Sequence, residues 1–502
     1  MKLFIRVDAS TQIGTGHVMR CLALAQAWQY AGGQVIFVMA TEAPDLTTRL
    51  NTEGMELIHL PIQIGSAEDA KETAKLAREF NANWVVVDGY HFGAKYQEII
   101  KESERKLLFI DDYGHAKQYH ADIVLNQNIH ACEGWYRNRQ PYTKLLLGTS
   151  YSLLRREFWH WRGWQRSLPL PPIAKKLLVT LGGADPDNVT LKVIEGLQQL
   201  EIEGLEAVVV LGGSNLHYEQ LRSASQKLQF PIRLERNVTN MPDLMAWADV
   251  AVTAGGSTCW ELAFMGLPSV ILILADNQRA IAEQLEVMGV VVNLGWHENV
   301  SGVEIASKVG QLLISAGRRE KMTRCSQELV DSQGSSQVLS HLKDNFFQLR
   351  SVQQDDCRLL WEWSNAPEVR AVSFSSKSIL WEHHVQWFKS KLINPNCIFY
   401  IAINKNDVPI GQIRYDIESY EATVSMSIDP KFRKQDYGSS LIKLTCKQIF
   451  YYSNITRINA YIKPSNQASL RAFSKAGFQS MGITTLQGNQ AILLIIDKCK
   501  FD

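Results

Sequence analysis

Continuous apolar runs alternate with amphipathic segments in the first part of the chain. Residues 3–7 and 35–38 are short apolar runs, as expected for strands that a parallel sheet buries on both faces. Between them, apolar residues recur at helical spacing over residues 18–28. The pattern predicts a β-α-β unit with an amphipathic helix, and Gly14 and Gly16 lie in its first turn.

Later apolar runs in this part of the chain end in polar residues. The tails of these runs begin at Asp88, Asp111, Asn126 and Gly148. Ligands of open α/β sheets bind beyond the carboxyl ends of the strands, so these tails should converge on one crevice. Asp8, Asp88 and Tyr90 are candidate binding residues there, and capping of strand ends is the alternative interpretation.

His17 stands where the first helix begins, directly after the glycine loop. Free N–H groups at a helix start attract an anion, and the positive end of the helix dipole favours a neutral imidazole. A neutral imidazole can take a proton from water. His17 is therefore a candidate general base beside a phosphate site, and a helix cap is the alternative.

A second alternating set follows the proline-rich linker at residues 169–172. Two of its strands lead into glycine loops whose amides and hydroxyls suit a diphosphate, and Glu261 can accept hydrogen bonds from two ribose hydroxyls. The D-P-D at 185–187 is interpreted as a helix start rather than a metal site. Residues 334–336 are expected to form a loose connection. The residues expected around the nucleotide are Gly182, Gly183, Gly255, Gly256, Ser257, Thr258, Glu261 and Asn277.

The pattern changes near residue 346. Period-two runs at 397–403 and 409–415 predict antiparallel strands. A third run, residues 423–430, leads through a basic loop into a helix whose start can hold a pyrophosphate. We expect a mixed sheet here, in an α+β domain.

Composition narrows the choice of partners. The chain has 502 residues, 52 Lys and Arg against 51 Asp and Glu, and eight scattered cysteines. Its length predicts roughly three domains. Balanced charge argues against nucleic acid, and the lack of a signal peptide or long apolar run argues against a membrane. Scattered cysteines favour reduced thiols and no zinc. We expect a cytoplasmic protein, with its oligomeric state left open.

Several of these segments together resemble the UDP-sugar hydrolases of pseudaminic acid biosynthesis. The resemblance covers about residues 1–345. It is carried by residues 7–20, 88–90, 111–112, 125–128 and 151–158, and by the loop that leads to Glu261. It implies two Rossmann-like domains of the GT-B type, similar to the peptidoglycan N-acetylglucosaminyltransferase, with the nucleotide held by the second domain.

That resemblance also implies a reaction. The family removes UDP from UDP-2,4-diacetamido-2,4,6-trideoxy-β-L-altropyranose without a metal, and its general base corresponds to His17. Arg155, in the 151–158 segment, joins the expected substrate-binding residues. A GT-B glycosyltransferase would differ mainly in letting an acceptor hydroxyl replace the water.

The last part of the chain resembles the GNAT superfamily of acetyl-CoA-dependent N-acetyltransferases. The resemblance is carried by the loop 433–441 and the segment 466–478, and the W-x-W-x-N at 361–365 is similar to the pathway's UDP-4-amino-sugar N-acetyltransferase. Candidate bases for the amine are His383, His384, Glu418 and Glu421. The resemblance implies acetyl-CoA contacts at Met426, Ile428, Arg433, Tyr437, Gly438, Ser439, Asn466, Ser469, Phe473 and Lys475.

Two residues depart from the GNAT pattern. Asp436 replaces the first glycine of the R-x-x-G-x-G loop, and Phe473 replaces a tyrosine that protonates the departing thiolate in many members. A degenerate acyl-CoA-binding module, or a protein N-acetyltransferase fused to a glycosyltransferase, therefore remains the alternative. The main expectation is three domains, at residues 1–165, 166–345 and 346–502. The third domain acetylates the 4-amino group, and the first two then hydrolyse the product.

Overall fold

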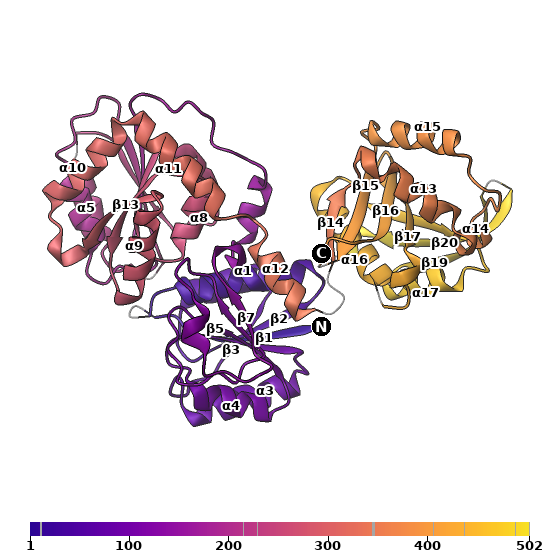
Figure 1. Ribbon diagram of the computed structural model, residues 1–502, viewed down its shortest axis with the longest axis horizontal. Coiled ribbons are helices and arrows are strands. Elements are labelled where there is room, and N and C mark those ends of the chain that lie inside the picture. The colour runs from indigo at the N-terminus through magenta and orange to yellow at the C-terminus, as the bar shows by residue number, and fades with distance from the viewer. Residues whose placement is uncertain are drawn as a thin grey trace. The chain divides into compact units, whose positions relative to one another are not determined.

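The computed structural model describes residues 1–10, 13–213, 215–227, 229–343, 347–404, 406–435, 437–486 and 488–500 (Figure 1). The chain divides into two compact units. Unit 1 contains residues 1–29 and 33–339, and unit 2 contains residues 30–32 and 340–502. No helix in the described ranges has the length and apolar character needed to cross a membrane.

Unit 1 begins with a parallel sheet in the order β3-β2-β1-β4-β5-β6-β7. Its central strands β1 and β4 are buried except for Lys2, which explains why most of their residues are apolar. The strands are β1 (Lys2–Val7), β2 (Gln34–Met39), β3 (Glu56–His59), β4 (Trp84–Asp88), β5 (Lys106–Ile110), β6 (Ile123–Asn126) and β7 (Lys144–Leu147). The helices are α1 (Gly16–Tyr30), α2 (Pro44–Thr52), α3 (Ala67–Glu79) and α4 (Ala94–Glu102).

The second sheet of unit 1 is also parallel, in the order β10-β9-β8-β11-β12-β13. Its strands are β8 (Lys176–Thr180), β9 (Glu206–Leu211), β10 (Ile232–Arg236), β11 (Val250–Ala254), β12 (Ser269–Ile273) and β13 (Val291–Trp296). The helices are α5 (Val189–Leu197), α6 (Tyr218–Ser225), α7 (Met241–Trp247), α8 (Thr258–Phe264), α9 (Arg279–Val287), α10 (Gly302–Leu313), α11 (Ala316–Leu329) and α12 (Gly334–Leu342).

Both sheets reverse their strand order at one point, between β1 and β4 and between β8 and β11. Connections leave these neighbouring strands in opposite directions, and the crevice that results is where open α/β sheets bind ligands. The predicted glycine loops follow β1, β8 and β11. The fold therefore places these loops at the two switch points.

Two local predictions for unit 1 were wrong. Helix α1 is not amphipathic: apart from Met19, every residue from His17 to Trp28 is buried. The face turned away from the sheet is covered by the segment after β7, where the Arg156 N–H donates to Gln26. Residues 334–336 open helix α12 instead of a loose connection. A Cβ on Gly334 would lie 2.1 Å from the Ser152 carbonyl oxygen, so glycine permits close packing there.

Unit 2 contains a mixed sheet in the order β14-β15-β16-β17-β18-β20-β19, as predicted. All neighbours are antiparallel except β17 and β18. The strands are β14 (Phe347–Ser351), β15 (Cys397–Asn404), β16 (Pro409–Glu418), β17 (Glu421–Ile428), β18 (Arg457–Ile462), β19 (Gln479–Leu486) and β20 (Asn489–Asp497). The helices are α13 (Cys357–Asn365), α14 (Pro367–Val372), α15 (Trp381–Leu392), α16 (Tyr437–Tyr452) and α17 (Gln467–Lys475).

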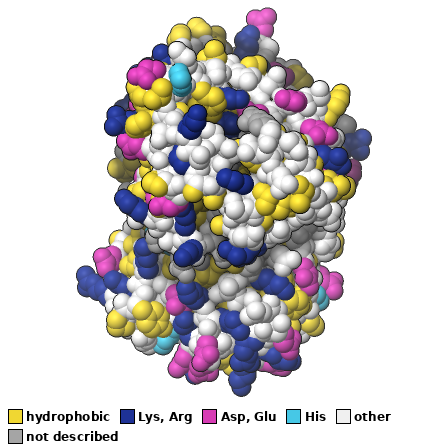
Figure 2. Space-filling view, turned by 90° about the vertical axis from the view of Figure 1, so that its right-hand side faces the viewer, with side chains coloured by type: hydrophobic (Ala, Val, Ile, Leu, Met, Phe, Trp, Pro, Cys, Tyr) yellow, Lys and Arg dark blue, Asp and Glu magenta, His cyan; other side chains and the backbone are white. Residues whose placement is uncertain are grey.

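Charges of both signs occur on the surface. On the face drawn in Figure 2, Lys and Arg side chains occur throughout, with acidic and apolar side chains between them. This distribution agrees with a formal net charge of +1 for the whole chain.

Candidate active sites

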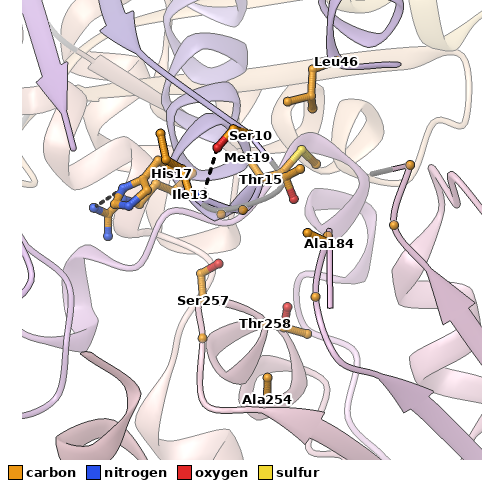
Figure 3. Close-up of a pocket in the computed structure, with 18 of the residues that line it drawn as sticks. Ser10, Ile13, Thr15, His17, Met19, Leu46, Ala184, Ala254, Ser257 and Thr258 are labelled. Carbon is orange, nitrogen blue, oxygen red and sulfur yellow. Dashed lines mark hydrogen bonds between the residues drawn. The ribbon is translucent and has the colours of Figure 1, made fainter. Parts of the chain in front are cut away.

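One cavity of about 1160 Å³ in unit 1 collects the predicted hydrolase residues (Figure 3). It is lined from the carboxyl ends of both parallel sheets, because the switch points of the two sheets open into it. The predicted residues that line it are Asp8, Gly14, Gly16, His17, Asp88, Tyr90, Arg155, Gly182, Gly183, Gly255, Gly256, Ser257, Thr258, Glu261 and Asn277.

The His17 imidazole is held by a buried carboxylate at the end of β4. Its Nδ1 lies 2.7 Å from Oδ1 of Asp88, and both side chains are buried. A carboxylate can only accept, so this shorter contact assigns the hydrogen to Nδ1; an Arg20 terminal nitrogen, also a donor, lies farther away at 3.1 Å from the same atom. In the neutral ring, Nε2 is then left with a lone pair. This is the tautomer that a general base facing the cavity requires.

Arg20 fixes Asp88 in turn. The Arg20 Nε lies 2.6 Å from one Asp88 oxygen, and one terminal nitrogen lies 2.6 Å from the other. The second terminal nitrogen lies 2.6 Å from an Asp112 oxygen. Burial would raise the pKa of Asp88, but Arg20 and His17 lower it below its ordinary value. Asn128 also donates to Asp112 at 2.8 Å. Sequence reasoning assigned no role to Arg20, Asp112 or Asn128, since their pairing spans up to 92 residues.

Tyr90 connects this network with the second sheet. Its hydroxyl donates to Asp112 at 2.7 Å and accepts from Asn277 at 2.7 Å. Its ring meets the His17 ring edge-on, with centroids 4.9 Å apart. Burial and the Asp112 charge raise the pKa of Tyr90, so the phenol remains protonated and can donate. Tyr90 therefore lies beside the candidate base and contacts both halves of the cavity.

Asp8 lines the cavity but is used mainly for local structure. One carboxylate oxygen accepts from the backbone N–H groups of Ala40 and Thr41, at 2.6 and 3.1 Å, and the other accepts from the buried Arg6 guanidinium. These contacts fix the chain after β2. They match the capping interpretation that the sequence left open.

The glycine loops of the two sheets approach closely. A Cβ on Gly183 would lie 2.1 Å from Oγ1 of Thr15, so only glycine fits against the first loop. Across the cavity, a Cβ on Gly16 would lie 3.8 Å from Oγ of Ser257. Figure 3 shows His17 and Thr15 on one side of the cavity and Ser257 with Thr258 on the other.

Glu261 is paired with Arg155. The Arg155 Nε and a terminal nitrogen donate to one Glu261 oxygen at 3.0 and 2.8 Å, and Arg155 also contacts Glu157 at 2.9 Å. Burial raises the pKa of Glu261, although Arg155 opposes the shift. Only one Glu261 oxygen is used by Arg155.

The D-P-D segment has a structural use. The two Asp185 oxygens accept from the N–H groups of Val189 and Thr190, both at 2.9 Å, at the start of α5. This agrees with the helix-start interpretation. Within the described ranges, no group of three or more His, Cys, Asp or Glu residues is placed to hold a metal ion.

The predicted acetyl-CoA residues meet at one end of β17. Strand β17 pairs with β18 only from Glu421 to Thr423, so its later residues diverge from β18. The ideal Cβ of Gly438, at the start of α16, would lie 3.5 Å from Met426, 3.8 Å from Ile428 and 3.9 Å from Ala472. The end of β17 and helices α16 and α17 therefore come together.

The remaining predicted residues surround this junction. The Arg433 Nε donates to the Ile428 carbonyl at 3.0 Å, and the Asn466 side chain caps α17 by accepting from the Ser469 N–H. Tyr437 and Ser439 are buried in the first turn of α16. Phe473 is buried against Phe478, whereas Lys475 is exposed. Asp436 lies outside the described residues.

The candidate bases for acetyl transfer do not gather at this junction. His384 is buried between aromatic rings and binds the Cys357 carbonyl at 3.0 Å, and burial lowers its pKa. Glu418 ends β16 and pairs with Glu421, which begins β17. Glu421 lies seven strand positions from Ile428, which corresponds to roughly 23 Å. His383 is exposed on α15. None of these placements identifies a base.

Two family models match separate parts of the chain. Residues 177–338 match the model described as "Glycosyltransferase family 28 C-terminal domain". Residues 347–479 match the model described as "Acetyltransferase (GNAT) domain". Together with the sheet orders, they define the class of the protein: a pair of parallel-sheet α/β domains of the GT-B type followed by a GNAT domain.

Curated relatives agree with this division. "Uncharacterized protein MJ1062" of Methanocaldococcus jannaschii is 23% identical over 95% of this chain and 97% of its own length. The "UDP-2,4-diacetamido-2,4,6-trideoxy-beta-L-altropyranose hydrolase" of Campylobacter jejuni is 27% identical over 58% of this chain and 97% of its own. An "Aminoglycoside N(6')-acetyltransferase type 1" of Klebsiella pneumoniae is 24% identical over 31% of this chain and 84% of its own length. The resemblances to the UDP-sugar hydrolases and to the GNAT superfamily are thus confirmed.

Proposed function

We propose that the chain is a bifunctional enzyme that catalyses two successive steps of nucleotide-sugar metabolism. The cavity of unit 1 hydrolyses UDP-2,4-diacetamido-2,4,6-trideoxy-β-L-altropyranose to the free sugar and UDP. The GNAT domain transfers acetyl from acetyl-CoA to the 4-amino group of the UDP-sugar precursor. The observation that carries the first activity is the 2.7 Å contact between His17 Nδ1 and Asp88, in a cavity whose other side consists of a glycine and hydroxyl loop.

The hydrolytic step follows from the positions of these groups. His17 Nε2 removes a proton from water as the water oxygen bonds to the anomeric carbon. The bond from that carbon to the diphosphate oxygen breaks, and its electron pair leaves with UDP. Amides at Gly255 and Gly256 and the hydroxyls of Ser257 and Thr258 would hold the departing charge. The free oxygen of Glu261 would bind the ribose.

Acetyl transfer would occur where β17 diverges from β18. The amine nitrogen bonds to the acetyl carbon, the carbon–sulfur bond breaks, and the coenzyme A thiolate leaves. The proton that the amine nitrogen loses passes through solvent to the thiolate. Backbone N–H groups between Met426 and Ile428 would polarise the acetyl carbonyl, and the start of α16 would hold the pyrophosphate. Phe473 cannot donate a proton, but a thiolate with a pKa of about 8.5 is a good leaving group.

The relatives support this assignment. The Campylobacter relative carries the name of the proposed hydrolytic activity, and the Klebsiella relative acetylates an amine of an aminoglycoside. The Methanocaldococcus relative matches 95% of the chain, so the fusion is not peculiar to this sequence. We assign catalysis to residues 1–165, nucleotide binding to residues 166–345 and acetyl transfer to residues 346–502. All eight cysteines are free, and we propose a cytoplasmic enzyme.

Mass spectrometry of one incubation tests both activities. The protein is mixed with the UDP-4-amino-sugar precursor and acetyl-CoA, and with each alone. Release of free diacetamido sugar and UDP, only when both substrates are present, is the expected result. A requirement for a sugar acceptor would instead favour the glycosyltransferase alternative. Absence of acetyl-CoA binding by calorimetry at millimolar concentration would favour a degenerate module.

Two further measurements concern the hydrolytic site. His17→Asn should lose most turnover and still bind UDP, because the other half of the cavity holds the nucleotide. An equal loss of UDP affinity would make His17 a ligand-holding residue. We also propose that hydrolysis needs no metal, so chelators should leave the rate unchanged. Inhibition that Mg²⁺ reverses would contradict this.

A further inference from the structure

The half of the cavity that contains His17 also contains an apolar wall, formed by Ile13, Met19 and Leu46. Figure 3 shows these three side chains on the same side of the cavity as His17, facing the side that carries Ser257 and Thr258. Leu46 is 9% exposed, and Ile13 and Met19 are half-buried. The wall therefore belongs to the half of the cavity that carries the proposed base, and it lies opposite the loop of Ser257 and Thr258.

Two hydroxyl groups near the wall each make one hydrogen bond inside the protein. The Ser10 hydroxyl accepts from the Ile13 N–H at 3.0 Å, which fixes Ile13 in the loop. On α2, the Thr48 hydroxyl donates to the Pro44 carbonyl at 3.0 Å. A sugar hydroxyl placed against the wall would lose its water without gaining a good partner. A methyl group there would lose nothing and would gain apolar contact.

We propose that the apolar wall determines specificity for a 6-deoxy sugar by receiving its C6 methyl group. The inference rests on the proposed hydrolase function, because it concerns the sugar next to the base. The acetamido groups are poorer candidates for the wall, since each brings an N–H and a carbonyl that require partners. The wall thus discriminates against UDP-sugars that carry a 6-hydroxyl.

The test compares two substrates that differ only at C6: the 2,4-diacetamido-2,4,6-trideoxy UDP-sugar and its 6-hydroxy counterpart. Wild-type enzyme should prefer the 6-deoxy substrate in kcat/KM by about 100-fold, the discrimination typical of an apolar pocket against an added hydroxyl. Met19→Gln and Leu46→Gln should each lower this ratio by about tenfold, chiefly by reducing kcat/KM for the 6-deoxy sugar. The inhibition constant for UDP should not change.

Two control variants make the test specific. Leu46→Met keeps the site apolar and should retain the ratio. Leu216→Gln makes the matched polar change at a residue 82% exposed that lines the same cavity from the second half, and it should affect both substrates equally. Thermal melting establishes that each variant is folded.

The outcomes separate the two proposals. Wild-type enzyme that hydrolyses neither substrate overturns the proposed function, and the inference with it. Wild-type enzyme that hydrolyses both substrates at similar kcat/KM overturns the inference alone. An unchanged ratio in both folded glutamine variants, Met19→Gln and Leu46→Gln, has the same consequence.

Discussion

Replacing Asp88 by asparagine tests how the structure sets the state of His17. The wild-type carboxylate faces only donors: His17 Nδ1 at 2.7 Å and two Arg20 nitrogens at 2.6 Å. An asparagine has one oxygen. Its amide NH₂ must therefore face either the Arg20 Nε–H, in the position of Oδ2, or both His17 Nδ1 and an Arg20 terminal N–H, in the position of Oδ1. The first arrangement buries two opposed donors. The second moves the His17 hydrogen to Nε2 and removes the lone pair that water needs.

Either arrangement is costly for catalysis. Loss of the oriented base should reduce kcat by about 10²–10⁴-fold, equivalent to roughly 2.7–5.5 kcal/mol of transition-state stabilisation. UDP release is followed by chromatography, and UDP affinity by calorimetry. The affinity should stay within about threefold, because the glycine and hydroxyl loop lies beyond β11. A folded Asp88→Asn enzyme with nearly normal kcat, or with UDP affinity reduced in proportion, would refute the reasoning.

Three other changes probe separate parts of the structure. Gly183→Ala places a methyl group against Thr15 and should slow hydrolysis. Adding Thr15→Gly to the same chain should restore much of the rate. A double mutant as slow as Gly183→Ala would disprove the clash. Buried His384 has a lowered pKa, so the GNAT domain should lose stability as pH falls below about 6.5, where the histidine of the unfolded chain takes a proton. Calorimetry measures this pH dependence of the unfolding transition, which should weaken in His384→Gln. An unchanged pH dependence in the variant would exclude His384 as its source. Asn466→Ala removes the cap of α17 and should cost about 1 kcal/mol of stability and raise KM for acetyl-CoA, while UDP-sugar hydrolysis stays constant.

The strands and glycine loops of unit 1 could be predicted from the sequence because parallel sheets impose simple rules. Strands buried on both faces must be continuously apolar, and their carboxyl ends must meet at one edge. For this reason, the tails of the first sheet could be assigned to one crevice; that the loops of Gly14, Gly182 and Gly256, from two sheets, line one cavity is a finding of the structure. The mixed sheet of unit 2 was predictable because its strands alternate with period two.

Contacts between distant side chains could not be predicted. The salt bridges of Arg20 with Asp88 and Asp112 depend on how helix α1 lies against the ends of β4 and β5, and no local pattern encodes that arrangement. Asp8 was predicted as a binding residue, but most of its contacts cap the chain after β2. Residues 334–336 looked like a linker because glycine and serine favour turns. The tight approach to Ser152 that makes this glycine useful is a tertiary contact.

The central claim is that water held by His17 attacks the anomeric carbon of the UDP-sugar. Hydrolysis in water enriched in ¹⁸O, followed by mass spectrometry of both products, tests this directly. The account predicts one ¹⁸O atom in the free sugar and none in UDP, together with strongly reduced formation of labelled sugar by His17→Asn. Label found in UDP would mean attack at phosphorus, and would contradict the account.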